Sequence, residues 1–285
     1  MSEEHKPIPE LDSIISGSEN EFKKKHHIAG RTEEWLGNNF KQYDVVKKLG
    51  QGAMAEVFQI YHPGLNKNFA LKLTGSSLDK AGTLSDQDSK RFIREARVSA
   101  KLKHPNIVSV IDNGTKEGRD YLIMDYVDGM TLDDYMVKKK PSIERCLKII
   151  VQIANALTHA HMQGVIHRDL KPGNIMMEGD DPMLMDFGLA KPVDVDTSFT
   201  QMGTVLGTPS YMAPEQAQGR IDEIDARSDV YGLGAILYYM LTGKAPFERK
   251  VVMATLMAVV REDVIPPSEH KSGIPDGVEA ICLKD

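Results

Sequence analysis

The run HRDLKPGN at residues 167–174 decides the interpretation of this chain, together with DFG at residues 186–188, which begins twelve residues after Asn174. The first run carries an aspartate, a lysine and an asparagine, at Asp169, Lys171 and Asn174. A lone aspartate in a loop is usually a turn or cap residue. Eight consecutive residues with these side chains at these offsets are much harder to attribute to a turn, and they indicate a site that handles anionic groups.

The side chains in these two runs match the needs of phosphoryl transfer. The transferred group is highly anionic, so Mg²⁺ and fixed cations must neutralise it. Asn174 and Asp186 offer the hard oxygen ligands that Mg²⁺ prefers. Asp169 can accept the proton of an attacking hydroxyl, and Lys171 can contact the moving phosphoryl group as a point charge. The two runs therefore predict a magnesium-assisted phosphotransferase site.

A glycine-rich turn, LGQGAMAEV at residues 49–57, lies upstream of this site. A β-type run follows the glycines, which disfavours a dinucleotide-binding turn and favours a hairpin whose N–H groups close over phosphates. Lys72 follows between apolar neighbours, where an ammonium group needs anionic partners. Glu95, in the predicted helix 89–103, can supply that counter-charge. Taken alone, Lys72 also fits a surface lysine on an edge strand, and Glu95 fits a solvated helix residue.

The hydrophobic pattern divides the chain into three parts. Residues 1–39 are polar, residues 40–127 carry short β-type runs and one helix, and residues 128–285 are mostly helical. The expected strands are 43–49, 56–61, 68–73, 108–111 and 121–126, with a turn at 113–114. The expected helices include 89–103, 143–162 and 227–242, and Thr131 with Asp134 has a capping pattern. The pattern predicts an α+β fold, a small β-rich half followed by a larger helical half.

The composition is that of an acidic globular protein: of 285 residues, 41% are hydrophobic and 27% charged, with a formal net charge of −6. Such a chain without a concentrated basic stripe is a poor nucleic-acid binder, and the run KKKHH at 23–27 fits a solvated arm better than a basic patch. The longest apolar stretch, 230–241, is too short to span a membrane, and the N-terminus lacks a signal-peptide pattern. Two isolated cysteines, Cys146 and Cys282, indicate a reducing compartment. We therefore expect a cytoplasmic protein with no nucleic-acid partner.

Together, the motifs resemble those of eukaryotic-type protein kinases, from residue 40 to residue 285 and in the right order. They comprise the Gly50 turn, Lys72, Glu95, HRDLKPGN, DFG, APE at 213–215 and SDVYG at 228–232. The form LGTPSYMAPEQ at 206–216 is most similar to the serine/threonine kinases of bacteria. The resemblance implies a bilobal fold, with an ATP-binding small lobe of antiparallel strands and one main helix at 40–127 and a catalytic, mostly helical lobe at 128–285.

The resemblance also implies roles for individual residues. Lys72 would hold the α- and β-phosphates of ATP and pair with Glu95, and Asp169 would be the catalytic base. The full catalytic set that it implies is Asp169, Lys171, Lys72, Glu95, Asn174 and Thr208, with Asn174 and Asp186 binding Mg²⁺. The residues that it places around ATP are Leu49, Gly50, Gln51, Gly52, Ala53, Val57, Ala70, Lys72, Met124, Asp125, Val127, Met176 and Asp186. Among them, Val57, Ala70 and Met176 would sandwich the adenine ring, although core packing explains each equally well.

The implied function is that of an ATP- and Mg²⁺-dependent protein serine/threonine kinase. Its partners would be proteins with serine or threonine acceptors, and its control autophosphorylation of the loop between Asp186 and Glu215, with self-association for reaction in trans as an option. The candidate acceptors are Thr197, Ser198, Thr200 and Thr204, with Thr200 first, and Arg168 and Lys191 are available cations.

Two alternatives and two departures accompany this prediction. A pseudokinase or nucleotide-binding module would use the fold without turnover, although Lys72, Asp169 and Asp186 are all present. A small-molecule phosphotransferase is disfavoured by the segment GTPSYMAPE, which is typical of a peptide platform. Ala55 replaces the third glycine of the turn, with a modest expected effect. The family pattern would continue past Asp285 with two helices and an arginine to pair with Glu215, so we expect a marginally stable end of the large lobe.

Overall fold

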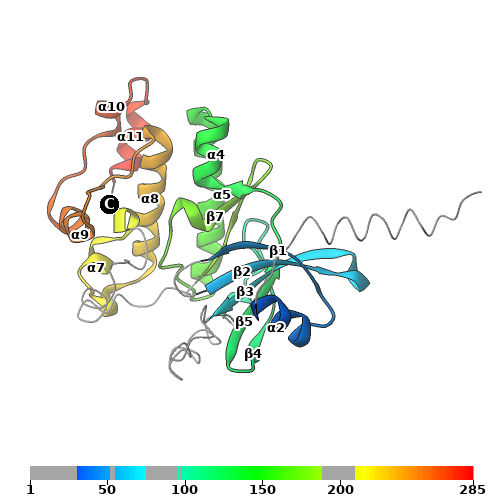
Figure 1. The fold of residues 1–285 in the computed structure, drawn as a ribbon. Helices are drawn as coiled ribbons and strands as arrows, with labels where there is room; N and C mark the ends of the chain where they lie inside the picture. Colours follow the sequence, from blue (N-terminus) through cyan, green and yellow to red (C-terminus); the bar gives the residue numbers. More distant parts are fainter. Residues whose placement is uncertain (1–30, 52–54, 75–95, 97, 188–208, 285) are drawn as a thin grey trace, which may run out of the picture.

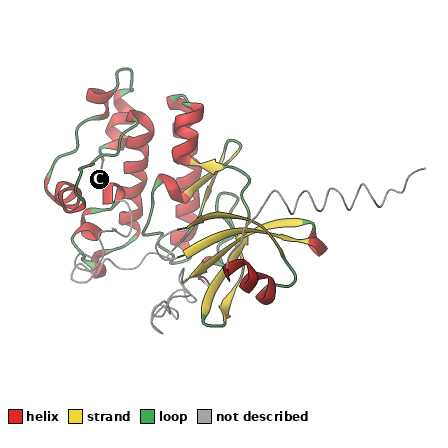
Figure 2. Ribbon diagram, in the orientation of Figure 1, coloured by secondary structure: helices red, strands yellow, loops and turns green. Residues whose placement is uncertain are grey.

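The computed structural model describes residues 31–51, 55–74, 96, 98–187 and 209–284. The strands gather on one side of the molecule and most of the helices on the other, as the colouring of Figure 2 makes plain. This arrangement confirms the predicted α+β, bilobal fold.

The small lobe is built on one five-stranded sheet in which neighbouring strands run antiparallel (Figure 1). Its strands, in the order β1-β2-β3-β5-β4, are β1 (Asp44–Gln51), β2 (Ala55–His62), β3 (Lys67–Thr74), β5 (Arg119–Asp125) and β4 (Val110–Lys116). Strand β2 pairs with β3 so that Val57 faces Lys72 across the ladder, and β1 pairs with β2 up to Gln51 and Glu56. The strands that flank the glycine-rich turn and the strand that carries Lys72 therefore belong to one sheet.

The two faces of this sheet carry different residues, as the alternation of side chains along a strand requires. One face, here called the outer face, packs against the helix α2 (Arg31–Asn39). The buried residues between this face and the helix, here called the outer-face cluster, are Leu36, Phe40, Phe58, Ile60, Phe69, Leu71, Leu73, Tyr121 and Ile123. The other face, the inner face, forms a separate cluster that includes residues of the large lobe such as Met176. Of the nucleotide-contacting residues expected from the sequence, Val57, Ala70 and Met124 lie on the inner face.

Strand β4 differs from the sequence-based prediction. A strand at 108–111 and a turn at 113–114 were expected, but β4 continues to Lys116 and the turn lies at Glu117 and Gly118. Those two residues adopt positive φ angles of 47° and 76°, the geometry of a tight two-residue hairpin turn. Gly114 instead gives room to a ring, because a Cβ there would lie 3.1 Å from the side chain of Tyr121. The glycine thus marks a close approach within the strand and not a turn.

The large lobe is organised around two buried helices, α5 (Ile143–Met162) and α8 (Ala226–Thr242). The other elements are α4 (Leu132–Lys139), α7 (Pro214–Ala217), α9 (Val252–Arg261), α10 (Pro267–His270), α11 (Asp276–Cys282) and a small sheet of β6 (Met130–Thr131), β7 (Ile175–Glu178) and β8 (Asp181–Leu184). Helix α5 has the predicted bounds, and Thr131 caps α4 by accepting a hydrogen bond from the Asp134 N–H at 3.2 Å. Within the described ranges, no helix has both the length and the apolar character that a bilayer crossing would need.

The chain crosses between the lobes along residues 126–129, close to where the sequence pattern changes. Gly129 lies directly against the backbone of β7, because a Cβ at this position would lie 2.0 Å from the carbonyl oxygen of Met177. Only glycine fits such a contact. The crossing is therefore held tightly to the strand that follows the HRDLKPGN run.

Candidate active site

Asp229 of α8 fixes the backbone at the start of the HRDLKPGN run. Its side chain is 1% exposed and accepts hydrogen bonds from the backbone N–H groups of His167, at 2.8 Å, and Arg168, at 2.9 Å. The His161 ring donates a third hydrogen bond at 2.7 Å. Burial alone would raise the pKa of Asp229, but the hydrogen bond from His161 and the neighbouring His167 and Arg168 lower it overall. The carboxylate therefore stays ionised and fixes two successive peptide groups.

Arg168 is held on its other side as well. Its φ angle is 67°, a left-handed conformation that is uncommon for residues other than glycine and costs on the order of 1–3 kcal/mol. Its carbonyl oxygen accepts a hydrogen bond of 2.7 Å from Gln216 Nε2, while Gln216 Oε1 accepts one of 3.0 Å from the Ala213 N–H. The Ala213–Gln216 segment and α8 thus maintain the unusual backbone conformation together.

Asp169, Lys171 and Asn174 form one hydrogen-bonded group. Lys171 Nζ lies 2.7 Å from Asp169 Oδ2, and Asn174 Nδ2 donates to the same oxygen at 2.9 Å. Asn174 Nδ2 also donates to the Asp169 carbonyl oxygen at 2.7 Å. These bonds orient the Asp169 carboxylate through Oδ2 and involve neither its Oδ1 nor Oδ1 of Asn174.

Lys72 and Asp186 come from different lobes and are in direct contact. Lys72 Nζ, on β3, lies 2.7 Å from Oδ1 of Asp186, just after β8. Burial alone would raise the pKa of Asp186, but Lys72 outweighs it, so that the pKa of this carboxyl group lies below its ordinary value. Asp186 has a φ angle of 61°, and the adjacent Met185 N–H bonds to the Asn174 carbonyl oxygen at 3.0 Å. The structure therefore brings Lys72, Asp186 and the Asn174 segment together between the lobes.

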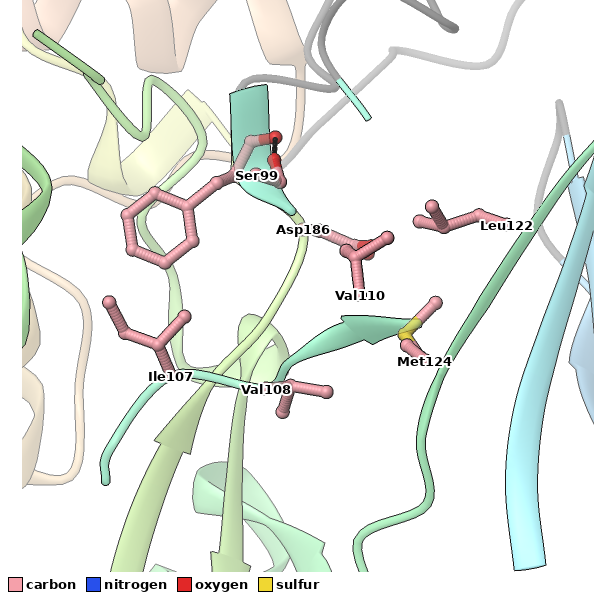
Figure 3. Close-up of a pocket in the computed structure, with 8 residues that line it drawn as sticks. Ser99, Ile107, Val108, Val110, Leu122, Met124 and Asp186 are labelled. Atoms are coloured by element: carbon pink, nitrogen blue, oxygen red, sulfur yellow. Dashed lines mark hydrogen bonds between the residues drawn. The ribbon is translucent and has the colours of Figure 1, made fainter. Parts of the chain in front are cut away.

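Phe187 follows Asp186 in the chain and is buried, which fixes the position of Asp186. Its ring is 3% exposed and lies 4.8 Å from the His167 ring, centroid to centroid. Its carbonyl oxygen accepts a hydrogen bond of 3.1 Å from Ser99 Oγ, the dashed line in Figure 3. A pocket opens beside it, lined by Ser99, Ile107, Val108, Val110, Leu122, Met124, Asp186 and Phe187 (Figure 3). One wall of this pocket is apolar, and Asp186 supplies a charged side chain at its edge.

The expected adenine-contacting residues gather beside this group. Val57, Ala70, Met124, Val127 and Met176 share one apolar cluster on the inner face of the sheet. Asp125, between two of them in the chain, uses its N–H in a bond of 3.0 Å to the Ser109 carbonyl oxygen. Strand β1 ends with the expected residues Leu49, Gly50 and Gln51, and Leu49 is 41% exposed. An apolar slot flanked by backbone polar groups suits a flat aromatic ligand.

Several predicted site residues lie outside the described residues. They are Gly52, Ala53, Glu95 and Thr208, together with the loop acceptors Thr197, Ser198, Thr200 and Thr204 and the cation Lys191. The pairing of Lys72 with Glu95 therefore remains an expectation. Glu215 accepts a hydrogen bond from Ser228 Oγ at the start of α8.

Sequence reasoning missed three positioning residues, His161, Gln216 and Ser99. Each bonds to a residue far away in the chain, so local spacing carried little information about its partner. His161 gave the clearest signal, since it ends a buried helix six residues before His167. Gln216 directly follows the APE run, but nothing in the sequence indicates that it reaches Arg168.

A β-rich lobe and a helical lobe that bring a lysine and two aspartates together between them define the class of kinase-like phosphotransferase folds. The protein kinase domain family matches residues 43–279, and the chain belongs to the protein kinase family.

Curated relatives agree with this assignment. The serine/threonine-protein kinase PknB of Mycobacterium leprae is 39% identical over 249 residues, which cover 85% of this chain and 39% of the relative. The serine/threonine-protein kinase pkn3 of Myxococcus xanthus is 38% identical over 267 residues, covering 89% of this chain and 48% of the relative. The chain thus spans less than half the length of these relatives. Among solved structures, a mutant form of the PknI kinase domain of Mycobacterium tuberculosis has a TM-score of 0.61 and 30% identity, covering 81% of each chain.

Proposed function

We propose that this protein is an ATP- and Mg²⁺-dependent protein serine/threonine kinase, which transfers the γ-phosphate of ATP to serine or threonine hydroxyls of other proteins. The observation that carries the proposal is the 2.7 Å contact between Lys72 and Asp186. It sets a fixed cation and an ionised carboxylate beside the Asp169–Lys171–Asn174 group. The names of the curated relatives support the choice of a protein hydroxyl as acceptor.

Adenine would enter the apolar slot between Val57 and Ala70 on one side and Met176 on the other. Because the Asp125 N–H already bonds to Ser109, the carbonyl oxygen of Asp125 and the backbone of Val127 are the groups left to recognise the ring edge. The thioether of Met124 would limit the depth of the slot. These contacts would hold the base while the phosphates extend toward Lys72.

The donor set fits Mg²⁺. Asn174 donates with its Nδ2, which leaves its Oδ1 as an available hard oxygen ligand, and the lowered pKa of Asp186 keeps that carboxylate charged. Asn174 Oδ1 and the Asp186 carboxylate would hold the ion, consistent with its preference for one or two protein oxygens plus phosphate oxygens. When bound, the ion neutralises charge on the phosphates. Lys72 would then leave Asp186 for the phosphate oxygens.

Asp169 would orient the acceptor hydroxyl. Lys171 and Asn174 both bond to Oδ2, so Oδ1 is the atom that would accept the hydroxyl proton. Lys171, 2.7 Å from Asp169, would stabilise negative charge on the phosphoryl group as it transfers. The left-handed backbone at Arg168 aims this carboxylate, since Asp229 and Gln216 fix the peptide groups before it.

Control by autophosphorylation between Asp186 and Glu215, with Thr200 as the first acceptor and self-association in trans, stays part of this proposal. So does a cytoplasmic location, which rests on the unpaired Cys146 and Cys282. The support for both is the sequence pattern.

Transfer of the γ-phosphate of radiolabelled ATP to a generic basic protein tests the proposal. The wild-type protein with Mg²⁺ should label the acceptor protein on serine or threonine. Asp169→Asn should lower the rate by about 10²- to 10⁴-fold, because it removes the proton acceptor with little change in shape. Asp186→Ala should abolish metal-dependent transfer. Nucleotide binding without any transfer by the wild-type protein would refute the proposal and establish a nucleotide-binding module instead.

A further inference from the structure

Helix α2 lies before the residues that match the family, yet it is part of the small lobe's core. The family match begins at residue 43, whereas α2 ends at Asn39. Figure 1 shows the helix lying against the sheet beside β5. Leu36 and Phe40 are 0% and 2% exposed within the outer-face cluster. The helix therefore packs as part of the hydrophobic core of the small lobe, against the sheet that carries the proposed nucleotide-binding residues.

A buried carboxylate, Glu56, is the second residue of β2, the strand that follows the glycine-rich turn. Its side chain is 7% exposed, and Lys48 on β1 contacts it at 2.7 Å. Lys48 Nζ also bonds to Gln51 Oε1 at 2.8 Å, at the other end of the same turn. A buried carboxylate is costly unless it is paired, so these contacts fix the spacing of the two strands that flank the turn.

The second cation at Glu56 is Arg119, which links the turn to α2. Arg119 Nη2 lies 3.2 Å from Glu56 Oε2, and the Arg119 side chain is 11% exposed. Its guanidinium lies 5.0 Å from the ring centre of Trp35, which packs edge-on against Phe40 at 6.0 Å. Trp35 thus covers the Arg119–Glu56 ion pair, and an ion pair shielded from water is stronger than an exposed one.

The end of α2 contacts the hairpin formed by β4 and β5, which also carries Arg119. Asn39 Nδ2 donates to Glu117 Oε2 at 3.2 Å, and Lys116 Nζ lies 4.1 Å above the Phe40 ring while bonding to the Asn39 carbonyl oxygen. Helix and β4–β5 hairpin therefore move together, and the hairpin supplies Arg119.

We propose that α2 is a positioning element for nucleotide binding, in which Trp35, acting through Arg119 and Glu56, sets the base of the glycine-rich turn. The inference rests on the proposed function, since it concerns the turn that would close over the phosphates of ATP. Trp35 lies on the outer face and Lys72 and Val57 on the inner face, so Trp35 acts on the site only through the strands. Its effect belongs to ATP affinity and not to the proton-transfer chemistry at Asp169.

Steady-state kinetics with the full chain and magnesium ATP test this role. Trp35→Ala should raise KM for ATP by about 3- to 10-fold, the loss expected for a partly buried cation–π contact, with kcat changed by less than about twofold. Trp35→Phe keeps a ring over Arg119 and should restore most of the affinity. Asn38→Ala, on the exposed side of α2, is the matched control and should match the wild type. A purely structural role would instead lower kcat in proportion to the folded fraction and leave KM unchanged.

A double-mutant cycle tests the route. Glu56→Gln should raise KM for ATP, and adding Trp35→Ala should raise it by much less than in the wild-type background, because both changes break one chain of contacts. Additive effects would overturn the proposed route. Arg119→Lys keeps the charge but loses the planar stacking on Trp35, so it should raise KM for ATP as Trp35→Ala does. It replaces Trp35→Ala in this test if Trp35→Ala is unfolded at the assay temperature.

Calorimetric titration with magnesium ATP separates the two levels of inference. Failure of the wild-type protein to bind ATP would refute the proposed function itself. Tight binding by wild type and by Trp35→Ala with equal Kd would leave that function intact and refute the role of α2.

Discussion

Asp229 is the residue on which the geometry of the HRDLKPGN run depends most. We predict that Asp229→Asn lowers the free energy of unfolding by about 1–3 kcal/mol at neutral pH, because an amide can accept only with its oxygen and leaves a buried N–H group without a partner. The native pKa of Asp229 lies below the ordinary value of 3.8, so its stabilising contribution is complete above that pH. The contribution is lost as the pH falls through the lowered native pKa.

Urea denaturation of both proteins between pH 7 and pH 3 checks this prediction. The difference in unfolding free energy should stay constant from pH 7 to about pH 4 and shrink below it. A difference that grows toward acid pH would show that the carboxylate is not the ionised acceptor described.

At the scale of residues, the sequence predicted those site members whose types and offsets are set within one loop. Asp169, Lys171 and Asn174 lie within six residues, so their proximity follows from the spacing, although the hydrogen bonds among them were not predicted. The resemblance placed Lys72 and Asp186 around one nucleotide, but it paired Lys72 with Glu95 and did not predict the direct contact of Lys72 with Asp186. The hydrogen bonds of Gln216 and Ser99 and the positive φ at Arg168 could not be predicted, because they arise from packing between distant segments.

At the scale of elements, the crossing segment lies against the backbone of β7 at Gly129. We predict that Gly129→Ala destabilises the protein by about 1–3 kcal/mol, since the added Cβ would overlap the Met177 carbonyl oxygen, and backbone cannot turn aside as a side chain can. Gly277→Ala in α11 is the control, because a Cβ there meets no atom within 4 Å and alanine favours a helix. Thermal unfolding followed by circular dichroism measures both. Equal melting temperatures for Gly129→Ala and wild type would contradict the described approach.

Helices and strands could be predicted where their sequence pattern is local, and not where their position depends on residues far along the chain. Helix α5 was predicted to its ends because its apolar pattern is local, and α8 was predicted within one residue of its start. β4 was predicted too short because Gly114 resembles a turn until the Tyr121 ring is known to lie over it. The role of α2 was missed because Trp35 and Leu36 gain their burial from strands far along the chain.

For the whole molecule, Lys72 and Asp186 form a contact across the two lobes, and bound magnesium nucleotide should replace that single contact with several, because it would contact residues of both lobes. We predict that magnesium ATP raises the melting temperature of the wild-type protein by several degrees. A ligand at about 100 times its Kd contributes about 2.7 kcal/mol to the folded state.

Thermal unfolding with and without Mg²⁺ is the measurement. ATP without the metal should give a smaller rise, because Asn174 and Asp186 would then lack the ion they are proposed to hold. Asp186→Ala should remove most of the metal-dependent part. An equal shift for wild type and Asp186→Ala would place the metal elsewhere.

Trp35 is the single tryptophan of the chain. Its indole packs on the outer face of the sheet, and the proposed adenine slot lies on the inner face, so the sheet separates the two. Ultraviolet fluorescence excited at wavelengths that tyrosine does not absorb therefore originates from one site on the back of the small lobe. A spectral change on adding nucleotide cannot come from a ligand touching that fluorophore, so it would report displacement of α2, and the protein carries its own optical probe for that motion.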